Sequence, residues 1–433
     1  MMNLKFRLPS LRQNHVLTGG ALLMISTTIV NGGNYLFNLI LGRWLGPAAF
    51  ADLSLIVTLM LMVTFITVTF QLTAARFTAV YMAAEDIGRL KALRRWLGRV
   101  AWGTGGLLAL VLGGGALFWM QFFHTASYWP FVILAVGMPV YFAQGVDRGI
   151  LQGQTRFGML SLSYQAEMWV RLVAAIGLVA VGLSVNGAVA GLTLSFVATW
   201  LVARRVGVSL KGVGGETAVD HRAIMTFAMP VIVAHLSQIL INNSDILIVK
   251  RFFAAEPAGQ YAALALIGRI VFFATWSVVT VLFPIVAQKH EKKEPHRHLL
   301  FISLMLVGLI SGFILLLSLF VPEIIVQLLF GKAYLSVSPL LWLYALATAL
   351  YAMANVVVNY HLSIGNGHGT VITLFAGMAQ VLGLWFFHAT LKQVVVAQIY
   401  IMATLLIILL MWDFWISVIA KRTIALKQAN VQL

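Results

Sequence analysis

Residues 299–321, LLFISLMLVGLISGFILLLSLFV, form an uninterrupted stretch of 23 residues that contains no charged side chain. A helix of about 20 apolar residues is long enough to cross the hydrocarbon core of a bilayer. Comparable stretches follow one another along the 433-residue chain, which is 61% hydrophobic and has a mean hydropathy of +0.94. Only 10% of the residues are charged, whereas soluble domains average about 25%. The sequence therefore predicts a polytopic membrane protein.

The apolar stretches are expected to be helices. Continuous apolar runs are typical of membrane helices, whereas the strands of a membrane β-barrel alternate in hydropathy over segments of about ten residues. The predicted fold class is thus all-α, with about 12 transmembrane helices. The expected spans are residues 16–41, 49–83, 97–120, 129–147, 159–182, 186–203, 223–249, 258–287, 299–321, 336–360, 370–390 and 393–420.

The basic residues are distributed unevenly between the two sides of this arrangement. If the N-terminus is cytoplasmic, 21 of the 29 Lys and Arg residues fall in cytoplasmic segments, including Arg148 and Arg156 in the fourth loop. Five fall on the opposite side and three lie inside spans. This positive-inside pattern predicts that both termini are cytoplasmic. We expect the basic stretch 89–99 to lie along anionic lipid headgroups, so the net charge of +16 indicates membrane lipids rather than nucleic acid as the partner.

Several classes of protein are excluded by what the sequence lacks. There is no cysteine, which excludes disulfide frameworks, thiol catalysis and Cys-based metal sites. The phosphate-binding loop of an ATP-driven exporter is absent, and HEKKE at His290–Glu294 lacks the second histidine of a zinc protease motif. No long segment outside the spans could hold an enzymatic domain. We expect no enzyme, no cofactor and no bound metal, with H⁺ or Na⁺ as the candidate coupling ion.

The chain contains weak internal similarity between its two halves. A nearly constant offset of 209 to 211 residues relates three separated pairs of segments, namely Asn34 and Asn243, Pro47 and Pro257, and the segments Leu151–Gly158 and Leu362–Gly369. We predict an N-terminal six-helix lobe at 1–205, a cytoplasmic linker at 206–221 and a C-terminal six-helix lobe at 222–433. An even number of spans gives both lobes the same orientation, and transporters of this design work by rocking one lobe against the other.

Four segments together resemble one known family. They are NYLFNLILGRWLGPAAFADLSLI (34–56), RGILQGQTRFG (148–158), SDILIVKRFFAAEPAGQYAALALIGRI (244–270) and LLFGKAYLSVSPLL (328–341). In their order and spacing they are similar to the polysaccharide transporter family, the bacterial flippases of O-antigen and exopolysaccharide repeat units. The superfamily also contains MATE-type multidrug exporters and the lipid II flippase. Some relatives have fourteen spans, so an added pair of helices is absent here.

The resemblance implies a MATE-like fold and a specific cargo. That cargo is a polyprenyl-diphosphate-linked oligosaccharide, which is moved from the cytoplasmic to the periplasmic leaflet of the bacterial inner membrane for O-antigen, capsule or exopolysaccharide synthesis. The implied partners are this lipid-linked oligosaccharide, membrane lipids, and the polysaccharide polymerase and chain-length machinery.

Basic residues inside or at the ends of spans are the candidates for binding this cargo. A charge at the bilayer centre costs about 2.5–3.5 kcal/mol on insertion scales, so it should face protein or water. A diphosphate suits arginine forks and lysine point charges. We expect a cationic cavity formed by Arg269, Arg76, Arg171, Lys250 and Arg251. The alternatives are a structural ion pair for Arg269, snorkelling to the interface for Arg76, and plain solvation for the two residues at the end of span seven.

Acidic residues inside the spans are candidates for coupling or gating. Glu167 lies four residues before Arg171, a spacing that favours an ion pair within one helix. Asp245 is accompanied by Asn242, and their oxygens suit a proton or a hard cation. Alternatively, Asp245 pairs with one of the basic residues that close its span. Asn34, in the polar cluster of span one, is expected to bend that helix or contact sugar hydroxyls, with close helix packing as the alternative.

Two other functions are weighed against the flippase. A MATE-type cation-coupled multidrug exporter should favour acidic cavities for cationic drugs, whereas this chain offers arginines within its spans. A membrane-embedded polysaccharide polymerase generally has a substantial periplasmic loop. The longest such loop here, around 322–335, is short and apolar.

Overall fold

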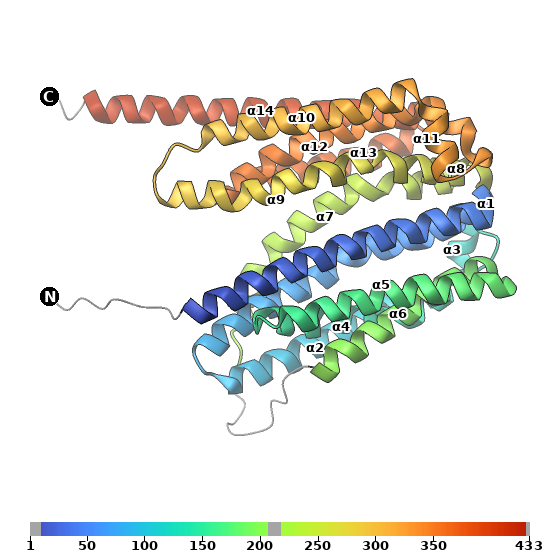
Figure 1. Cartoon of the computed structure of the whole chain (residues 1–433), viewed down its shortest axis with the longest axis horizontal. Coiled ribbons are helices and arrows are strands. Elements are labelled where there is room, and N and C mark those ends of the chain that lie inside the picture. The colour runs from blue at the N-terminus through green and yellow to red at the C-terminus, as the bar shows by residue number, and fades with distance from the viewer. Residues whose placement is uncertain (1–9, 207–217, 430–433) are drawn as a thin grey trace. The chain divides into compact units, whose positions relative to one another are not determined.

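The computed structural model describes residues 10–206 and 218–429, and every regular element within these residues is a helix (Figure 1). The predicted all-α fold class is therefore confirmed. Contacts between helices divide the chain into two units, residues 1–232 and 233–433. The first contains α1 (Ser10–Ala83), α2 (Ile87–Ala109), α3 (Ala116–Phe123), α4 (Trp129–Gly153), α5 (Phe157–Leu178), α6 (Ser184–Val206) and the start of α7 (His221–Phe252). The second contains the rest of α7, α8 (Ala255–Gly268), α9 (Ile270–Glu291), α10 (Arg297–Phe320), α11 (Pro322–Leu329), α12 (Leu341–Ser363), α13 (His368–Phe386) and α14 (Leu391–Ala429).

The order of helices occurs twice along the chain. Helix α10 begins 210 residues after α2, and α13 begins 211 residues after α5. The predicted lobe boundaries, with a linker at 206–221, stay a prediction, because residues 207–217 lie outside the described residues.

Ten helical segments of the described chain are long and apolar enough to cross a membrane, and two of them are long enough to cross twice. One of these two runs from Gly19 to Ala83 and breaks at Gly46, whose φ of 72° is a conformation that residues with a Cβ avoid. Pro47 follows and has no N–H to donate, so the chain turns back and the second half of α1 begins a new span (Figure 1). The other, Phe157–Arg204, is interrupted at Gly182 and Ser184, where φ is also positive. Twelve spans result.

Helix α2 begins at Ile87, ten residues before the expected start of the third span. Asp86 caps this end, since its carboxylate accepts a hydrogen bond from the Arg89 amide at 2.8 Å. The buried side chains of this half are Leu90, Leu93 and Leu97, which lie on one face. The basic stretch 89–99 therefore belongs to the first turns of a membrane helix. Its position along lipid headgroups stays a prediction.

Close packing of α1 against α4 holds the first unit together. A Cβ added at Gly145, Gly149 or Gly153 would lie 2.3–2.8 Å from the backbone oxygen of Thr67, Gln71 or Ala75, respectively. The three glycines are spaced four residues apart, as are their three contacts on α1, so the two helices touch along a glycine stripe. This contact brings the polar side chains of α1 within reach of those on α4 and α5.

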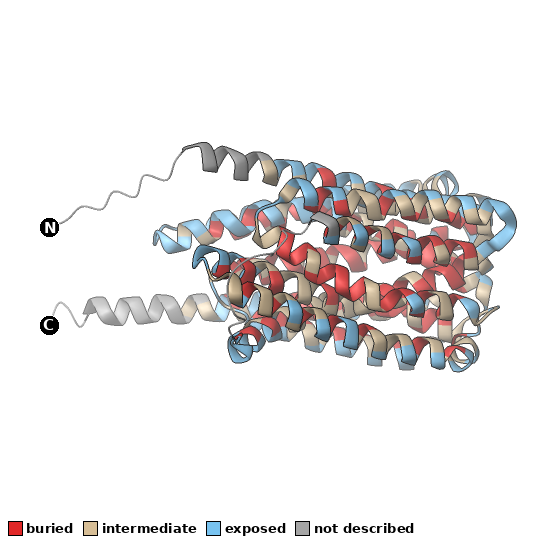
Figure 2. Cartoon of the chain, turned by 90° about the horizontal axis from the view of Figure 1, so that it is seen from below, coloured by how far each residue is buried: buried red, intermediate tan, exposed pale blue. Residues whose placement is uncertain are grey.

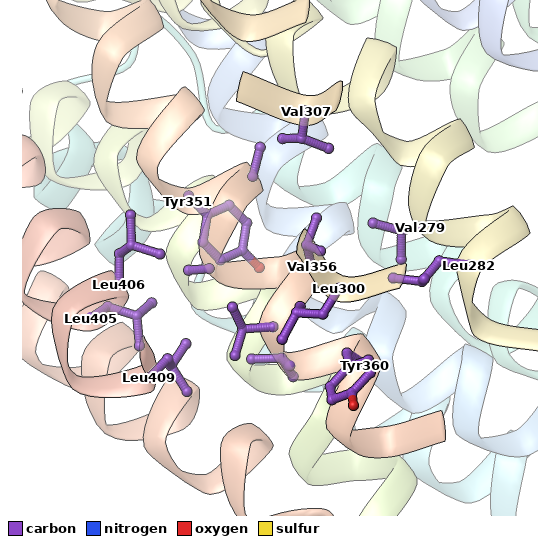
Figure 3. Close-up of a cluster of buried hydrophobic side chains, with 14 of the residues drawn as sticks. Val279, Leu282, Leu300, Val307, Tyr351, Val356, Tyr360, Leu405, Leu406 and Leu409 are labelled. Carbon is purple, nitrogen blue, oxygen red and sulfur yellow. The ribbon is translucent and has the colours of Figure 1, made fainter. Parts of the chain in front are cut away.

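The second unit has an apolar core supplied by α9, α10, α12 and α14 (Figure 3). Its labelled members are Val279, Leu282, Leu300, Val307, Tyr351, Val356, Tyr360, Leu405, Leu406 and Leu409. Many large apolar side chains are instead exposed, among them Phe320 at 75% and Phe386 at 74%. Exposed and buried residues share the same helices (Figure 2). Outward-facing apolar surface of this kind suits lipid rather than water.

Candidate functional site

A buried polar network in the first unit joins three of the predicted site residues. Arg171 on α5 donates from Nη1 to the Asn34 Oδ1 on α1 at 2.9 Å and from Nη2 to the Glu167 Oε1 at 2.5 Å. The predicted pair one helical turn apart is thus present, and Asn34 extends it to a second helix. Within the described residues the Arg171 Nε has no hydrogen-bond partner, although it is buried. A buried donor without a partner is costly, so the Arg171 Nε has unused hydrogen-bonding capacity.

The network contains a second arginine that the sequence analysis placed in a loop. Arg148 lies inside α4, is 6% exposed, and its Nη1 contacts the Glu167 Oε2 at 2.7 Å. It also donates to the Ser163 hydroxyl and carbonyl at 3.1 and 3.0 Å, and its guanidinium lies 4.1 Å from the centre of the Tyr164 ring. The loop assignment was wrong because the apolar run ends at residue 147 while the helix continues to Gly153. One carboxylate is therefore shared by two guanidinium groups, leaving a surplus positive charge.

Hydrogen bonds also connect this network to the second half of α1, which follows the break at Gly46. Gln71 donates to the Tyr164 hydroxyl and to the Gln152 Oε1, both at 2.9 Å. Three elements, α1, α4 and α5, therefore meet at one polar centre inside the first unit, which we call the Glu167 network (Asn34, Arg148, Ser163, Tyr164, Glu167 and Arg171).

A second polar centre lies in the second unit around Asp245, which is 1% exposed. Its Oδ1 accepts from the Arg269 Nη2 at 3.0 Å, and its Oδ2 accepts from the hydroxyls of Tyr261 and Tyr344 at 3.1 and 2.7 Å. Gln398 donates to the Tyr261 hydroxyl at 2.6 Å. Helices α7, α8, α12 and α14 thus converge on one carboxylate. We call this group the Asp245 network.

The structure shows which basic residue forms an ion pair with Asp245. Arg269, at the junction of α8 and α9, is this ion-pair partner. The contact matches the structural ion pair that the sequence analysis gave as the alternative role of Arg269. The Arg269 Nη1 also donates to the Asn243 Oδ1 at 3.3 Å. Asn243 and Asn34, one of the similar pairs between the two halves, therefore both accept a hydrogen bond from an arginine. The arginines themselves come from different helices of each half, so the sequence repeat does not extend to them.

Among the remaining predicted site residues, Arg76 and Asn242 contact residues that belong to neither network. Arg76 is exposed and its guanidinium lies 4.5 Å from the centre of the Phe227 ring. Lys250 is 2% exposed and Arg251 lies beside Phe252, both at the end of α7. Asn242 donates to the Gln238 carbonyl one turn earlier at 2.8 Å. The cationic cavity expected from these basic residues together with Arg171 and Arg269 stays a prediction.

The chemistry of the two networks differs. Both Asp245 oxygens accept hydrogen bonds from donors, an arrangement that balances the charge of Arg269 and presents no open ligand set for a cation. The Glu167 network carries one more positive than negative charge and suits an anion. No group of three or more His, Asp or Glu residues with metal-binding geometry occurs in the described ranges.

Comparison with known proteins gives both a family and a fold. The sequence profile of the family described as "Polysaccharide biosynthesis protein" matches residues 16–290. A multidrug resistance MATE family transporter of the MOP superfamily, solved in an inward-facing conformation, has 15% identity and a TM-score of 0.76, over 89% of this chain and 95% of its own. An outward-facing structure of such a transporter has 17% identity and a TM-score of 0.62, over 92% and 96% of the chains.

A third similar structure comes from Pyrococcus furiosus. It is a MOP superfamily transporter whose binding pocket is described as having reversed polarity, and it has 16% identity and a TM-score of 0.61, over 92% of this chain and 94% of its own. No curated protein matches the sequence significantly. At these identities the structural likeness establishes the MATE-like fold.

Proposed function

Because this chain belongs to the polysaccharide biosynthesis protein family, we propose that it moves a polyprenyl-diphosphate-linked oligosaccharide across the bacterial inner membrane. The product of this step would serve O-antigen, capsule or exopolysaccharide synthesis. Alternating access of two six-helix lobes is the proposed mechanism, in keeping with the MATE-like fold.

The observation that carries the proposal is the sharing of Glu167 by Arg148 and Arg171. A diphosphate bears about two negative charges and binds arginine through paired hydrogen bonds. Such an anion would compete with the carboxylate for the two guanidinium groups, while the unpartnered Arg171 Nε supplies a further donor. A cationic drug would meet a net positive charge at the same place, which disfavours the multidrug alternative.

The energetics of this movement are favourable. Moving an anion out of a negative interior gains roughly 2.3 kcal/mol per charge for each 100 mV, or about 4–5 kcal/mol for two charges. Proton or sodium coupling is therefore not required for net export. In this scheme, H⁺ or Na⁺ coupling would serve to reset the carrier.

Reconstitution into vesicles tests the proposal. Purified lipid-linked oligosaccharide should appear in the opposite leaflet at a rate that depends on the protein, and a cationic dye should not be transported. Arg171→Gln should lower the flipping rate at least about tenfold, because it removes the charge at the centre of the network. Arg89→Gln is the matched control, since Arg89 is an exposed residue that pairs with Asp86 at the start of α2. Dye transport without oligosaccharide flipping would contradict the proposal.

A further inference from the structure

A basic pocket of about 610 Å³ lies between α2, α4 and α6 of the first unit, and its lining residues are not members of the Glu167 network. Its positively charged lining residues are Lys91, Arg94, Arg95 and Arg204. Asp147 is the single acidic residue of the lining, and its Oδ1 contacts the Arg94 Nη2 at 3.1 Å. The lining therefore contains four basic side chains and one acidic side chain, a composition that favours an anion.

The pocket also has an aromatic wall. Trp102 of α2 and Trp200 of α6 both line it, with their ring centres 6.0 Å apart and nearly perpendicular. The Arg204 guanidinium lies 4.8 Å from the centre of the Trp200 ring. Tryptophan with arginine or lysine is typical of the level in a membrane where headgroups meet acyl chains.

Exposed apolar surface continues from this wall along the same two helices. Leu107 of α2 is 65% exposed, and Leu110, directly after the end of α2, is 73% exposed, while on α6 Leu194 is 49% and Leu201 is 40% exposed. A soluble anion would not make apolar contacts with this surface. A ligand with a charged head and apolar tails would contact both the basic lining of the pocket and the exposed apolar surface.

We propose that this pocket binds the phosphate headgroup of an anionic membrane lipid, with the acyl chains running along the exposed faces of α2 and α6. Three of the four basic residues lie in the first turns of α2 and the fourth near the end of α6, so a bound phosphate would bridge two helices that both pack against α4. Basic pockets between membrane helices recognise acidic headgroups through charge and through paired N–H donors. The site is independent of the transported cargo.

Lipid titration followed by native mass spectrometry tests this assignment. Phosphatidylglycerol should be retained by the purified protein and phosphatidylcholine should not. Removing two of the four basic lining residues with Arg95→Gln and Arg204→Gln should weaken phosphatidylglycerol binding about 25-fold, or roughly fivefold for each charge. Arg99→Gln should bind like the unmodified protein, because Arg99 is an exposed basic residue of the same helix that does not line the pocket.

Two further measurements keep the test decisive. Lys91→Gln removes one charge and is the milder variant if the double variant does not fold; it should weaken binding about fivefold. A titration with inorganic phosphate separates a lipid site from a site for a soluble anion. Equal phosphatidylglycerol binding by Lys91→Gln and Arg99→Gln would overturn the proposal. So would equal retention of the two lipids, or phosphate binding that saturates in preference to phosphatidylglycerol.

Discussion

Glu167 is the counter-charge for two buried guanidinium groups, so its removal should be one of the most destabilising single changes in the first unit. In Glu167→Ala, Arg148 and Arg171 would face each other without a carboxylate between them. Breaking a buried ion pair from one side costs about 3–5 kcal/mol. Thermal unfolding in detergent should show a large drop in Tm.

The control for this change is Glu291→Ala, at the exposed end of α9. Exposed substitutions usually change stability by less than about 0.5 kcal/mol. If Glu167→Ala and Glu291→Ala unfold at the same temperature, the Glu167 network does not stabilise the fold in the way its geometry implies.

His296 should make stability depend on pH in mildly acidic conditions. It precedes α10, outside the spans, and its Nδ1 lies 2.9 Å from the Tyr360 hydroxyl. Burial lowers the pKa of His296 below its ordinary value of about 6.5, helped by the nearby His290. The unfolded chain therefore binds this proton more readily, and the free energy of unfolding should fall as pH drops below about 6.5.

A pH series of thermal midpoints between about pH 5 and 8 checks this prediction, with His296→Gln as the comparison. The variant cannot take up the proton, so the difference between its Tm and that of the unmodified protein should shrink as the medium is acidified. A difference that stays constant over the range would show that His296 does not titrate in this window.

At the scale of helices, the glycine stripe of α4 sets how closely α1 can approach. In Gly149→Ala the new Cβ would lie 2.3 Å from the Gln71 carbonyl oxygen, a backbone atom that cannot rotate away. The helices must separate, which weakens the hydrogen bonds that Gln71 makes across the Glu167 network. Overpacking of this kind costs about 1–3 kcal/mol.

Gly106→Ala is the matched control, because a Cβ at Gly106 of α2 meets nothing within 4 Å. Alanine is the better helix former by about 1 kcal/mol, so this variant should be unchanged or slightly more stable. Thermal unfolding of both variants in detergent gives the comparison. A Gly149→Ala protein as stable as Gly106→Ala would mean that α1 and α4 are not in such close contact.

Most helices could be predicted from the sequence, and the exceptions have physical reasons. Long apolar runs such as 299–321 specify both a helix and its approximate length, because lipid leaves the backbone no other partner. The start of α2 was set too late because its first turns carry basic residues on one side, whereas the buried leucines lie on the other. The break at Arg269, where α8 ends and α9 begins, lies within one apolar run and leaves no trace in hydropathy.

The candidate site was predictable only in part. Glu167 and Arg171 stand four residues apart on one helix, so their contact follows from helix geometry alone. The Asp245–Arg269 contact joins two helices. The sequence does not specify how each helix is rotated about its axis, and this rotation decides whether the two side chains face each other. Arg148 was missed because it comes directly after an apolar run that looked like a complete span.

At the scale of the whole molecule, the absence of cysteine makes membrane orientation directly measurable. A single introduced cysteine is then the sole thiol of the chain. Lys292 lies in the turn between α9 and α10, and Lys392 at the start of α14, and both are exposed. Three spans, α10, α12 and α13, separate the two positions, so they should face opposite sides of the membrane. The positive-inside pattern predicts that Lys292 faces the cytoplasm.

Labelling of intact cells with a membrane-impermeant thiol reagent therefore gives opposite results for the two positions. Lys392→Cys should be labelled in intact cells, whereas Lys292→Cys should react only after the inner membrane is opened. The reverse pattern would invert the whole chain and place the basic pocket of α2 at the outer face. Labelling of both positions from one side would be incompatible with three intervening spans. The result also fixes the direction of the membrane potential relative to the Glu167 network, and with it whether the potential assists export of an anionic cargo.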